Sequence, residues 1–76
     1  MEIAPHITVD PDTHHGAPII KGTRVPVSIV VGSLAGGMSK EEVSREYELT
    51  KEEVEAALAF AADLVAKTEV VSLMET

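Results

Sequence analysis

The chain has 76 residues, of which 45% are hydrophobic, and a formal net charge of −7. This length fits one small domain, and the hydrophobic content is too high for a disordered chain. The absence of cysteine excludes disulfides and thiolate metal sites. Tyr47 and Phe60 are the only aromatic residues, so the core should consist mainly of small Ala and Val side chains. Because such a domain is marginally stable alone, we expect a homodimer or a partner protein.

The acidic balance disfavours a free-standing nucleic-acid binder, which normally carries a basic surface, but leaves open contact through one local basic patch. Residues 1–5 lack the features of a signal peptide, and no stretch approaches about 18 uninterrupted apolar residues, so no membrane span is predicted. We therefore expect a soluble, cytoplasmic, single-domain protein. Its predicted parts are a β-hairpin and junction at 1–26, a helical core at 27–67 and a tail at 68–76.

Two short strands are predicted near the N-terminus, at Ile7–Val9 and at Pro18–Lys21, and they should pair as an antiparallel hairpin. The segment Asp10–Asp12 between them is rich in turn formers. Gly22 ends the second strand, because only glycine adopts a positive φ without cost. Pro26 keeps the preceding residue extended and suits the start of a helix.

The segment Val27–Ala35 has features of both a strand and a helix. Its β-branched residues favour a strand by propensity. Its context favours a helix, since Pro26 can open one and Gly36 with Gly37 can close it. We predict a helix, and because it is apolar nearly all round, it should be central in the fold.

Two capping boxes mark the next helix starts. Ser39 is followed three residues later by Glu42, and Thr50 is followed at the same spacing by Glu53. In such a box the hydroxyl accepts from the backbone of the third residue, whose carboxylate reaches back to the cap. Acidic residues in a first turn also interact favourably with the helix dipole.

The helices that begin at these boxes should span 40–47 and 51–67. In the second, apolar residues at helical spacing predict one buried face. Its members are Val54, Ala57, Leu58, Ala61 and Val65. The segment 68–76 carries no helix caps, and we predict an extended tail that orders on a partner.

A short helix, a tight connection at 48–49 and a longer helix form a helix-turn-helix pattern. Together with the helix at 27–35, they predict a mainly α fold with a three-helix, homeodomain-like core. The usual turn glycine is missing, and the start of the reading helix carries Glu52, Glu53 and Glu55, which repel phosphate. An inert helical scaffold therefore has about as much support as a DNA reader.

Several cationic or polar side chains could still contact DNA phosphates. They are Lys21, Thr23, Arg24, Lys40, Arg45 and Lys51. Lys21 and Arg24 flank the Gly22 turn, and they could equally pair with Asp or Glu.

A second apolar stripe on the long helix contains Ala56, Ala59 and Phe60. It could simply pack against the N-terminal hairpin. We favour a dimer interface, because the core is thin and the helix carries two apolar faces.

Nothing in the sequence predicts an enzyme, a metal site or a cofactor. The imidazoles are His6, His14 and His15, and the adjacent pair in a loop points to opposite sides, which suits joint metal ligation poorly. No nucleophile elbow, P-loop or dinucleotide-binding glycine pattern is present.

Three runs carry a resemblance to a known family. They are G-A-P-I-I-K-G-T-R-V-P-V-S at 16–28, G-G-M-S-K-E-E-V at 36–43 and Y-E-L-T-K-E-E-V-E-A-A-L-A-F-A at 47–61. Over about residues 7–62, the chain resembles the domain of unknown function 433 family. Its members are small bacterial and archaeal proteins with a homeodomain-like core. Many are encoded beside a PIN-like toxin and are regarded as VapB-type antitoxins.

The resemblance implies a type II antitoxin that binds and inhibits a PIN-like ribonuclease and, with it, binds operator DNA to repress its own operon. It carries over no catalytic residue. The acidic surface suits a basic nuclease groove, and the tail could add a strand to the toxin or fill a groove on it. The tail residues expected to contact the toxin are Val70, Val71, Leu73 and Met74. The alternatives are a stand-alone helix-turn-helix transcriptional regulator and a purely structural dimer.

Overall fold

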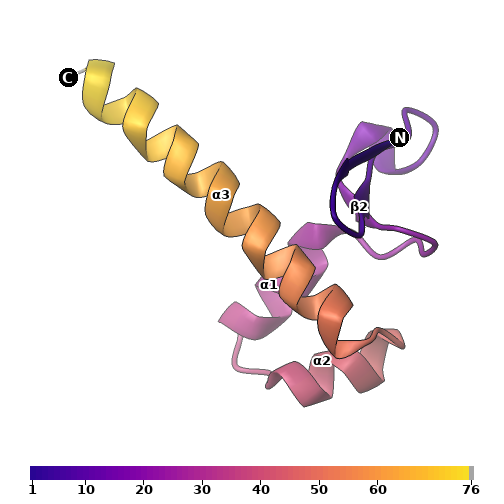
Figure 1. The fold of residues 1–76 in the computed structure, drawn as a ribbon. Coiled ribbons are helices and arrows are strands. Elements are labelled where there is room, and N and C mark those ends of the chain that lie inside the picture. The colour runs from indigo at the N-terminus through magenta and orange to yellow at the C-terminus, as the bar shows by residue number, and fades with distance from the viewer. Residues whose placement is uncertain (76) are drawn as a thin grey trace.

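The computed structural model describes the backbone of residues 1–75 and the side chains of residues 1–68. The elements in chain order are β1 (Glu2–Ala4), β2 (Ile7–Thr8), the 3-10 turn η1 (His14–Gly16), β3 (Ile19–Ile20), α1 (Val27–Ala35), α2 (Lys40–Tyr47) and α3 (Lys51–Glu75). In Figure 1, α3 is a long rod, with α1 and α2 gathered at its N-terminal end and the small sheet to one side. The prediction of a mainly α fold with three helices and a short N-terminal β structure is confirmed.

The sheet is antiparallel and has the order β1-β2-β3. The predicted hairpin is confirmed, with Ile7 opposite Ile20, although both strands are shorter than expected. The carboxylate of Asp10 accepts a hydrogen bond from the Asp12 backbone at 2.9 Å, which builds the predicted turn. β1 was not predicted; it pairs with β2 and makes the hairpin a three-stranded sheet.

The helical interpretation of α1 is confirmed. Pro26 precedes the helix with a φ of −67°, the value that the proline ring imposes. At the other end, Gly37 has a φ of +111°, and the Met38 N–H donates to the Ser33 carbonyl at 3.1 Å. This bond spans five residues and satisfies a carbonyl of the last turn, as a glycine-terminated helix requires.

Both capping boxes are confirmed, and they fix where α2 and α3 begin. The Ser39 hydroxyl accepts from the Glu42 N–H at 3.1 Å, and the Glu42 carboxylate accepts from the Ser39 N–H at 2.8 Å. Thr50 and Glu53 make the same two bonds at the same distances. Between these boxes, Glu48 has a φ of 55° and takes the left-handed position that glycine usually occupies in such a turn.

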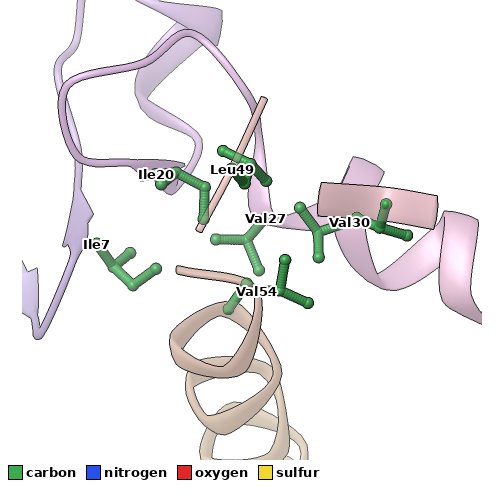
Figure 2. Close-up of a cluster of buried hydrophobic side chains, with 8 residues drawn as sticks. Ile7, Ile20, Val27, Val30, Leu49 and Val54 are labelled. Carbon is green, nitrogen blue, oxygen red and sulfur yellow. The ribbon is translucent and has the colours of Figure 1, made fainter. Parts of the chain in front are cut away.

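The core lies where the sheet and the three helices meet. Figure 2 shows Ile7 and Ile20 from the sheet, Val27 and Val30 from α1, Leu49 from the connection and Val54 from α3. Among the described side chains, no polar or charged group is buried, and no aromatic ring is fully buried. The expectation of a core made mainly of Ala and Val is confirmed for valine only: four valines are buried, but Ala57 is the one buried alanine among the described residues, and isoleucine and leucine supply the rest.

The prediction that the last helix ends at residue 67 is wrong, and so is the extended tail. α3 continues to Glu75. No glycine or proline follows Gly37, so nothing in the sequence breaks the helix where its caps are absent. Val65, predicted on the buried face, is 57% exposed because α1, α2 and β2 cover only the first part of α3. Within residues 1–75, no helix is both long and apolar enough to cross a bilayer.

Candidate functional site

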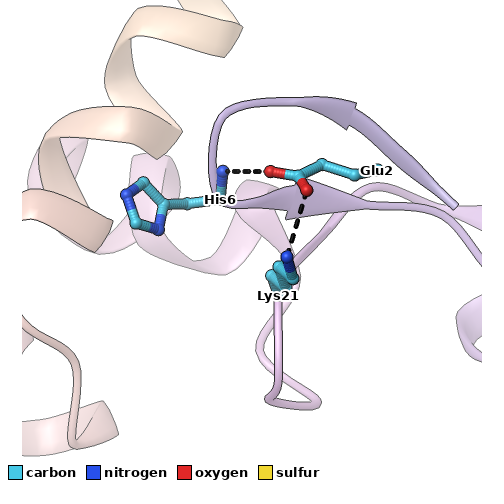
Figure 3. A network of polar contacts seen from close by, with 3 residues as sticks. All are labelled: Glu2, His6 and Lys21. Carbon is cyan, nitrogen blue, oxygen red and sulfur yellow. Dashed lines mark hydrogen bonds and ion pairs between the residues drawn. The ribbon is translucent and has the colours of Figure 1, made fainter.

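Lys21, predicted as a phosphate contact, is engaged within the sheet. Its Nζ donates to the Glu2 carboxylate at 3.1 Å, and the other oxygen of Glu2 accepts from the His6 N–H at 3.2 Å (Figure 3). These two hydrogen bonds, with that of Lys21 the stronger cause, lower the pKa of Glu2 below its ordinary value of 4.5. The structure thus contains the ion pair that the sequence left as an alternative to phosphate binding.

Thr23 and Arg24 have different roles in the junction after β3. The Thr23 hydroxyl donates to the Ile20 carbonyl at 2.8 Å and accepts from the Val25 N–H at 3.0 Å, so it closes the turn. The Arg24 carbonyl accepts from His14 Nε2 at 2.9 Å. The exposed Arg24 guanidinium forms no ion pair with any side chain of residues 1–68. Thr23 is therefore architectural, and Arg24 is the cation that the junction leaves accessible.

Of the three cations predicted in the helix-turn-helix, the structure places two close together. Lys40 and Lys51 line one shallow hollow between the starts of α2 and α3, together with Glu41. Lys40 Nζ also lies 3.9 Å from the Glu55 carboxylate, a loose and exposed pair. Arg45 is exposed on α2. Each predicted phosphate contact in this region therefore stands among carboxylates.

We call residues 39–55 the acidic segment. It holds seven glutamates against three basic residues, and thus −4 of the net charge of −7. Glu53 is half-buried and the other six glutamates are exposed. The Ser39 backbone N–H, followed by its hydroxyl, lowers the pKa of Glu42 below 4.5, which keeps that carboxylate charged. Charges so close together act within the Debye length of about 8 Å, so this end of the molecule is strongly negative.

The stripe predicted as a dimer interface lies partly against the sheet. Ala56, Ala59 and Phe60 line a hollow of about 250 Å³ together with Ala4 and Pro5. Phe60 is half-buried and packs against the core. Ala56 is half-buried and Ala59 is exposed, so Phe60 is the member of this stripe that the protomer's own core engages.

Phe60 also borders a second hollow of about 250 Å³, which we call the α1–α3 groove. Pro18, Val31 and Leu64 contribute to its almost wholly apolar lining. Sequence reasoning did not single out Leu64, although its spacing from Ala61 places it on the apolar face. Four predicted toxin contacts, Val70, Val71, Leu73 and Met74, lie outside the described side chains.

The histidines occupy turns rather than a common site. His6, His14 and His15 have φ values of 65°, 50° and 57°. In the part of the chain that the structure describes, no three His, Asp or Glu side chains come together as metal ligands would.

The fold and surface define a small helix-turn-helix-like domain with an acidic end, and the comparisons place it in a family. Residues 7–61 match the family described as "Protein of unknown function (DUF433)". Because this match covers most of the chain, the chain belongs to the DUF433 family. No curated protein matches it.

Two solved structures are similar to this chain. One is a DUF433 member protein from Anabaena variabilis, with a TM-score of 0.75 and 26% sequence identity, covering 84% of this chain and 64% of that chain. The other is Rv2018 from Mycobacterium tuberculosis, with a TM-score of 0.63 and 31% identity, covering 68% of this chain and 24% of that chain. This chain therefore spans less than two thirds of the length of either protein.

Proposed function

We propose that this protein is the antitoxin of a type II toxin–antitoxin system and that it binds and inhibits a PIN-like ribonuclease. The observation that carries the proposal is the exposed acidic segment, held rigid by two capping boxes. A ribonuclease binds a polyanion, so its substrate groove is basic. An acidic protein surface complements such a groove and speeds encounter with it. The family resemblance supplies the class of toxin.

The glutamates of the acidic segment differ in their availability to a partner. Glu42 and Glu53 are used as helix caps, and Glu55 lies near Lys40. The remaining four make no hydrogen bond or ion pair with the described side chains. They are Glu41, Glu46, Glu48 and Glu52. We assign the toxin contact to these four carboxylates.

Operator binding is a second candidate, favoured by the helix-turn-helix arrangement of α2 and α3. The cations available to it are Arg24, Arg45 and Lys51, but the glutamates beside them repel phosphate. We therefore assign any operator binding to the complex with a basic partner rather than to this chain alone.

The direct experiment uses the purified PIN-like protein encoded by the adjacent gene. We expect it to bind this chain, to lose ribonuclease activity on binding and to bind more weakly as salt rises. Isothermal titration calorimetry at two salt concentrations and an RNA cleavage assay measure these effects. Absence of both binding and inhibition would refute the proposal, and salt-dependent binding of the chain alone to its own promoter would favour the stand-alone regulator.

A pair of charge reversals locates the contact. Glu52→Lys changes the acidic segment, and we expect it to weaken toxin binding by about tenfold or more. Asp12→Lys makes the same change in charge on the exposed loop after β2, and we expect less than about a twofold effect. Equal effects of the two variants would show that only the overall charge matters. They would refute the assignment of the toxin contact to the acidic segment.

A further inference from the structure

The hollow between α3 and the turn after β1, which we call the turn hollow, is apolar except at its rim. Its lining residues are Ala4 and Pro5 on one side and Ala56, Ala59, Phe60 and Asp63 on the other. Among these lining residues, Asp63 alone is charged. The volume of about 250 Å³ is below the range of about 300–1,000 Å³ typical of small-molecule sites. A single side chain of a partner protein therefore suits the hollow better than a cofactor.

The side of the hollow that the sheet supplies is held in place. The ring of Pro5 fixes its own φ. The next residue, His6, has a φ of 65°, and its N–H donates to the Glu2 carboxylate at 3.2 Å (Figure 3). Lys21 Nζ donates to the other oxygen of that carboxylate at 3.1 Å. The hollow is thus formed before a partner arrives, which lowers the entropic cost of binding.

Carboxylates stand at both ends of the hollow along α3. Asp63 lies four residues after Ala59, and Glu52 lies four residues before Ala56. Residues at this spacing are neighbours on a helix surface, and both carboxylates are exposed. Asp63 pairs with Lys67 at 3.0 Å, but both side chains are more than half exposed. Because such exposed pairs contribute little, a partner's cation can replace Lys67.

We propose that the turn hollow receives an arginine side chain of a basic partner protein. The carbon stem of the arginine lies against Ala56 and Ala59, and its guanidinium donates to the Asp63 carboxylate. Arginine buries its stem along apolar surface while its charged head stays at a polar rim. A guanidinium also stacks on an aromatic ring such as that of Phe60 and bonds both oxygens of a carboxylate, which the ammonium of lysine does not.

This site extends the contact assigned to the acidic segment, and it rests on the proposed function for the identity of the partner. Glu52 belongs to the acidic segment, so the two surfaces are continuous along α3. The acidic segment attracts a basic partner over a distance, whereas the hollow offers a pocket for one anchoring side chain. A second copy of this chain, with a net charge of −7, would bring like charges together here.

Solution NMR of the full chain with N-acetyl-arginine methylamide tests the hollow without any toxin. We expect saturable shifts of the Ala59 methyl and Phe60 ring signals at millimolar concentrations of the probe. Ala59→Leu fills the hollow and Asp63→Asn removes its carboxylate, so each should abolish these shifts. The absence of shifts, or equal shifts with the uncharged norleucine analogue, would overturn the proposal.

Two substitutions separate a partner contact of Asp63 from its ion pair within α3. Asp63→Asn should weaken binding of the purified PIN-like protein by about three- to tenfold, because it removes the carboxylate that the guanidinium contacts. Lys67→Gln should leave binding unchanged or tighten it by up to about twofold, since it removes a competing cation. Isothermal titration calorimetry measures both. Equal weakening by the two variants would overturn the proposed contact.

A matched pair of exposed alanines tests the shape of the hollow. Ala59→Leu should weaken binding of the PIN-like protein by about tenfold or more, because it occupies the space for the arginine. Ala35→Leu makes the same change at the end of α1 and should stay within about twofold of the parent. Circular dichroism shows that both variants fold. Equal effects of the two would overturn the proposal.

These measurements also distinguish failure of the site from failure of the proposed function. If the PIN-like protein does not bind the parent chain, the proposed function fails, and the arginine probe still decides whether the hollow binds a guanidinium. If the PIN-like protein binds and Glu52→Lys weakens it while Ala59→Leu does not, the hollow is overturned and the acidic segment remains the contact.

Discussion

The two halves of α3 belong to one continuous helix but have different surroundings. In residues 51–61, Val54 and Ala57 are buried among α1, α2 and β2. In residues 62–75, Leu64 and Val65 continue the same stripe and are more than half exposed. The helical spacing of apolar residues therefore predicts which face of α3 is apolar. Whether that face is buried depends on which other elements pack against it.

The two halves of α3 should therefore contribute differently to the stability of the protomer. Full burial of one valine stabilises a protein by about 1.5–3 kcal/mol, so the packed half of α3 holds the protomer together. The side chains of residues 62–68 are all exposed, so this part of α3 depends mainly on helical hydrogen bonds and propensity, which are marginal in water. We therefore expect substitutions in the first half to change protomer stability strongly and substitutions in the second to change it little.

The largest effect should come from the same substitution placed in each half. Val54→Asp buries an unpaired carboxylate, at a cost of several kcal/mol, which removes much or all of the stability of a small domain. Val65→Asp, on the same face but exposed, should change protomer stability by less than about 0.5 kcal/mol. Urea unfolding followed by circular dichroism, at a concentration where the chain is monomeric, measures both. Similar losses of stability in the two variants would contradict the conclusion that only the first half of α3 is packed in the protomer core.

A smaller effect is expected at the ends of the helices that cover the packed half. Gly37→Ala should destabilise the protein by about 1–3 kcal/mol. A Cβ there meets no atom within 4 Å, so the cost comes from the positive φ alone. Glu48→Gly should raise stability by less than about 1 kcal/mol, because relief at φ 55° is offset by the entropy of glycine. Thermal unfolding shows whether each substitution raises or lowers the stability. A stabilising effect of Gly37→Ala would refute the argument that the positive φ requires glycine there.

Two threonines, one that caps α3 and one within it, offer a finer comparison. Thr50→Ala removes a helix cap and should cost about 1 kcal/mol, which lowers Tm by about 4–8 °C in a domain of this size. Thr68 lies in the exposed part of α3 after Ala61, where its hydroxyl donates to the Leu64 carbonyl at 2.9 Å. Thr68→Ala should leave Tm unchanged or raise it slightly, since alanine is the better helix former. A loss of stability in Thr68→Ala as large as in Thr50→Ala would show that the second half of α3 also contributes to protomer stability.

The smallest effect should appear in acid. The pKa values of Glu2 and Glu42 are lowered below 4.5, so the folded state binds fewer protons than the unfolded chain near that pH. The stability that these two carboxylates contribute is fully present above their ordinary pKa. It is lost as the pH falls through their lowered pKa values in the folded state. We expect Tm to decrease below about pH 5, and the decrease to be shallower in Glu2→Gln and Glu42→Gln. Glu41→Gln is the control, and an equally shallow decrease in it would contradict the assignment to these hydrogen bonds.

The sequence was sufficient for features that depend on nearby residues. Ser39 with Glu42 and Thr50 with Glu53 are local patterns, and both predicted capping boxes form. The helix after Pro26 was predicted despite its β-branched residues. Pro26 before it and the glycines after it are typical of helix ends, and they indicated a helix more strongly than its interior indicated a strand. The acidic segment was equally visible, since its glutamates are close in sequence.

Features that depend on distant residues were missed. β1 has only three residues, too few for a recognisable alternation, and without it the Glu2 partner of Lys21 could not be identified. The exposure of Leu64 and Val65 also could not be predicted, because it depends on where α1 and the sheet end along α3. The part of the apolar stripe that stays exposed is therefore set by tertiary structure.

Amide hydrogen exchange along α3 tests the central claim most directly. We predict that residues 51–61 are strongly protected, because the protomer's own core covers Val54 and Ala57. Residues 62–75 should exchange more rapidly, because Leu64 and Val65 are more than half exposed. Protection of residues 62–75 as strong as that of residues 51–61 would contradict the account.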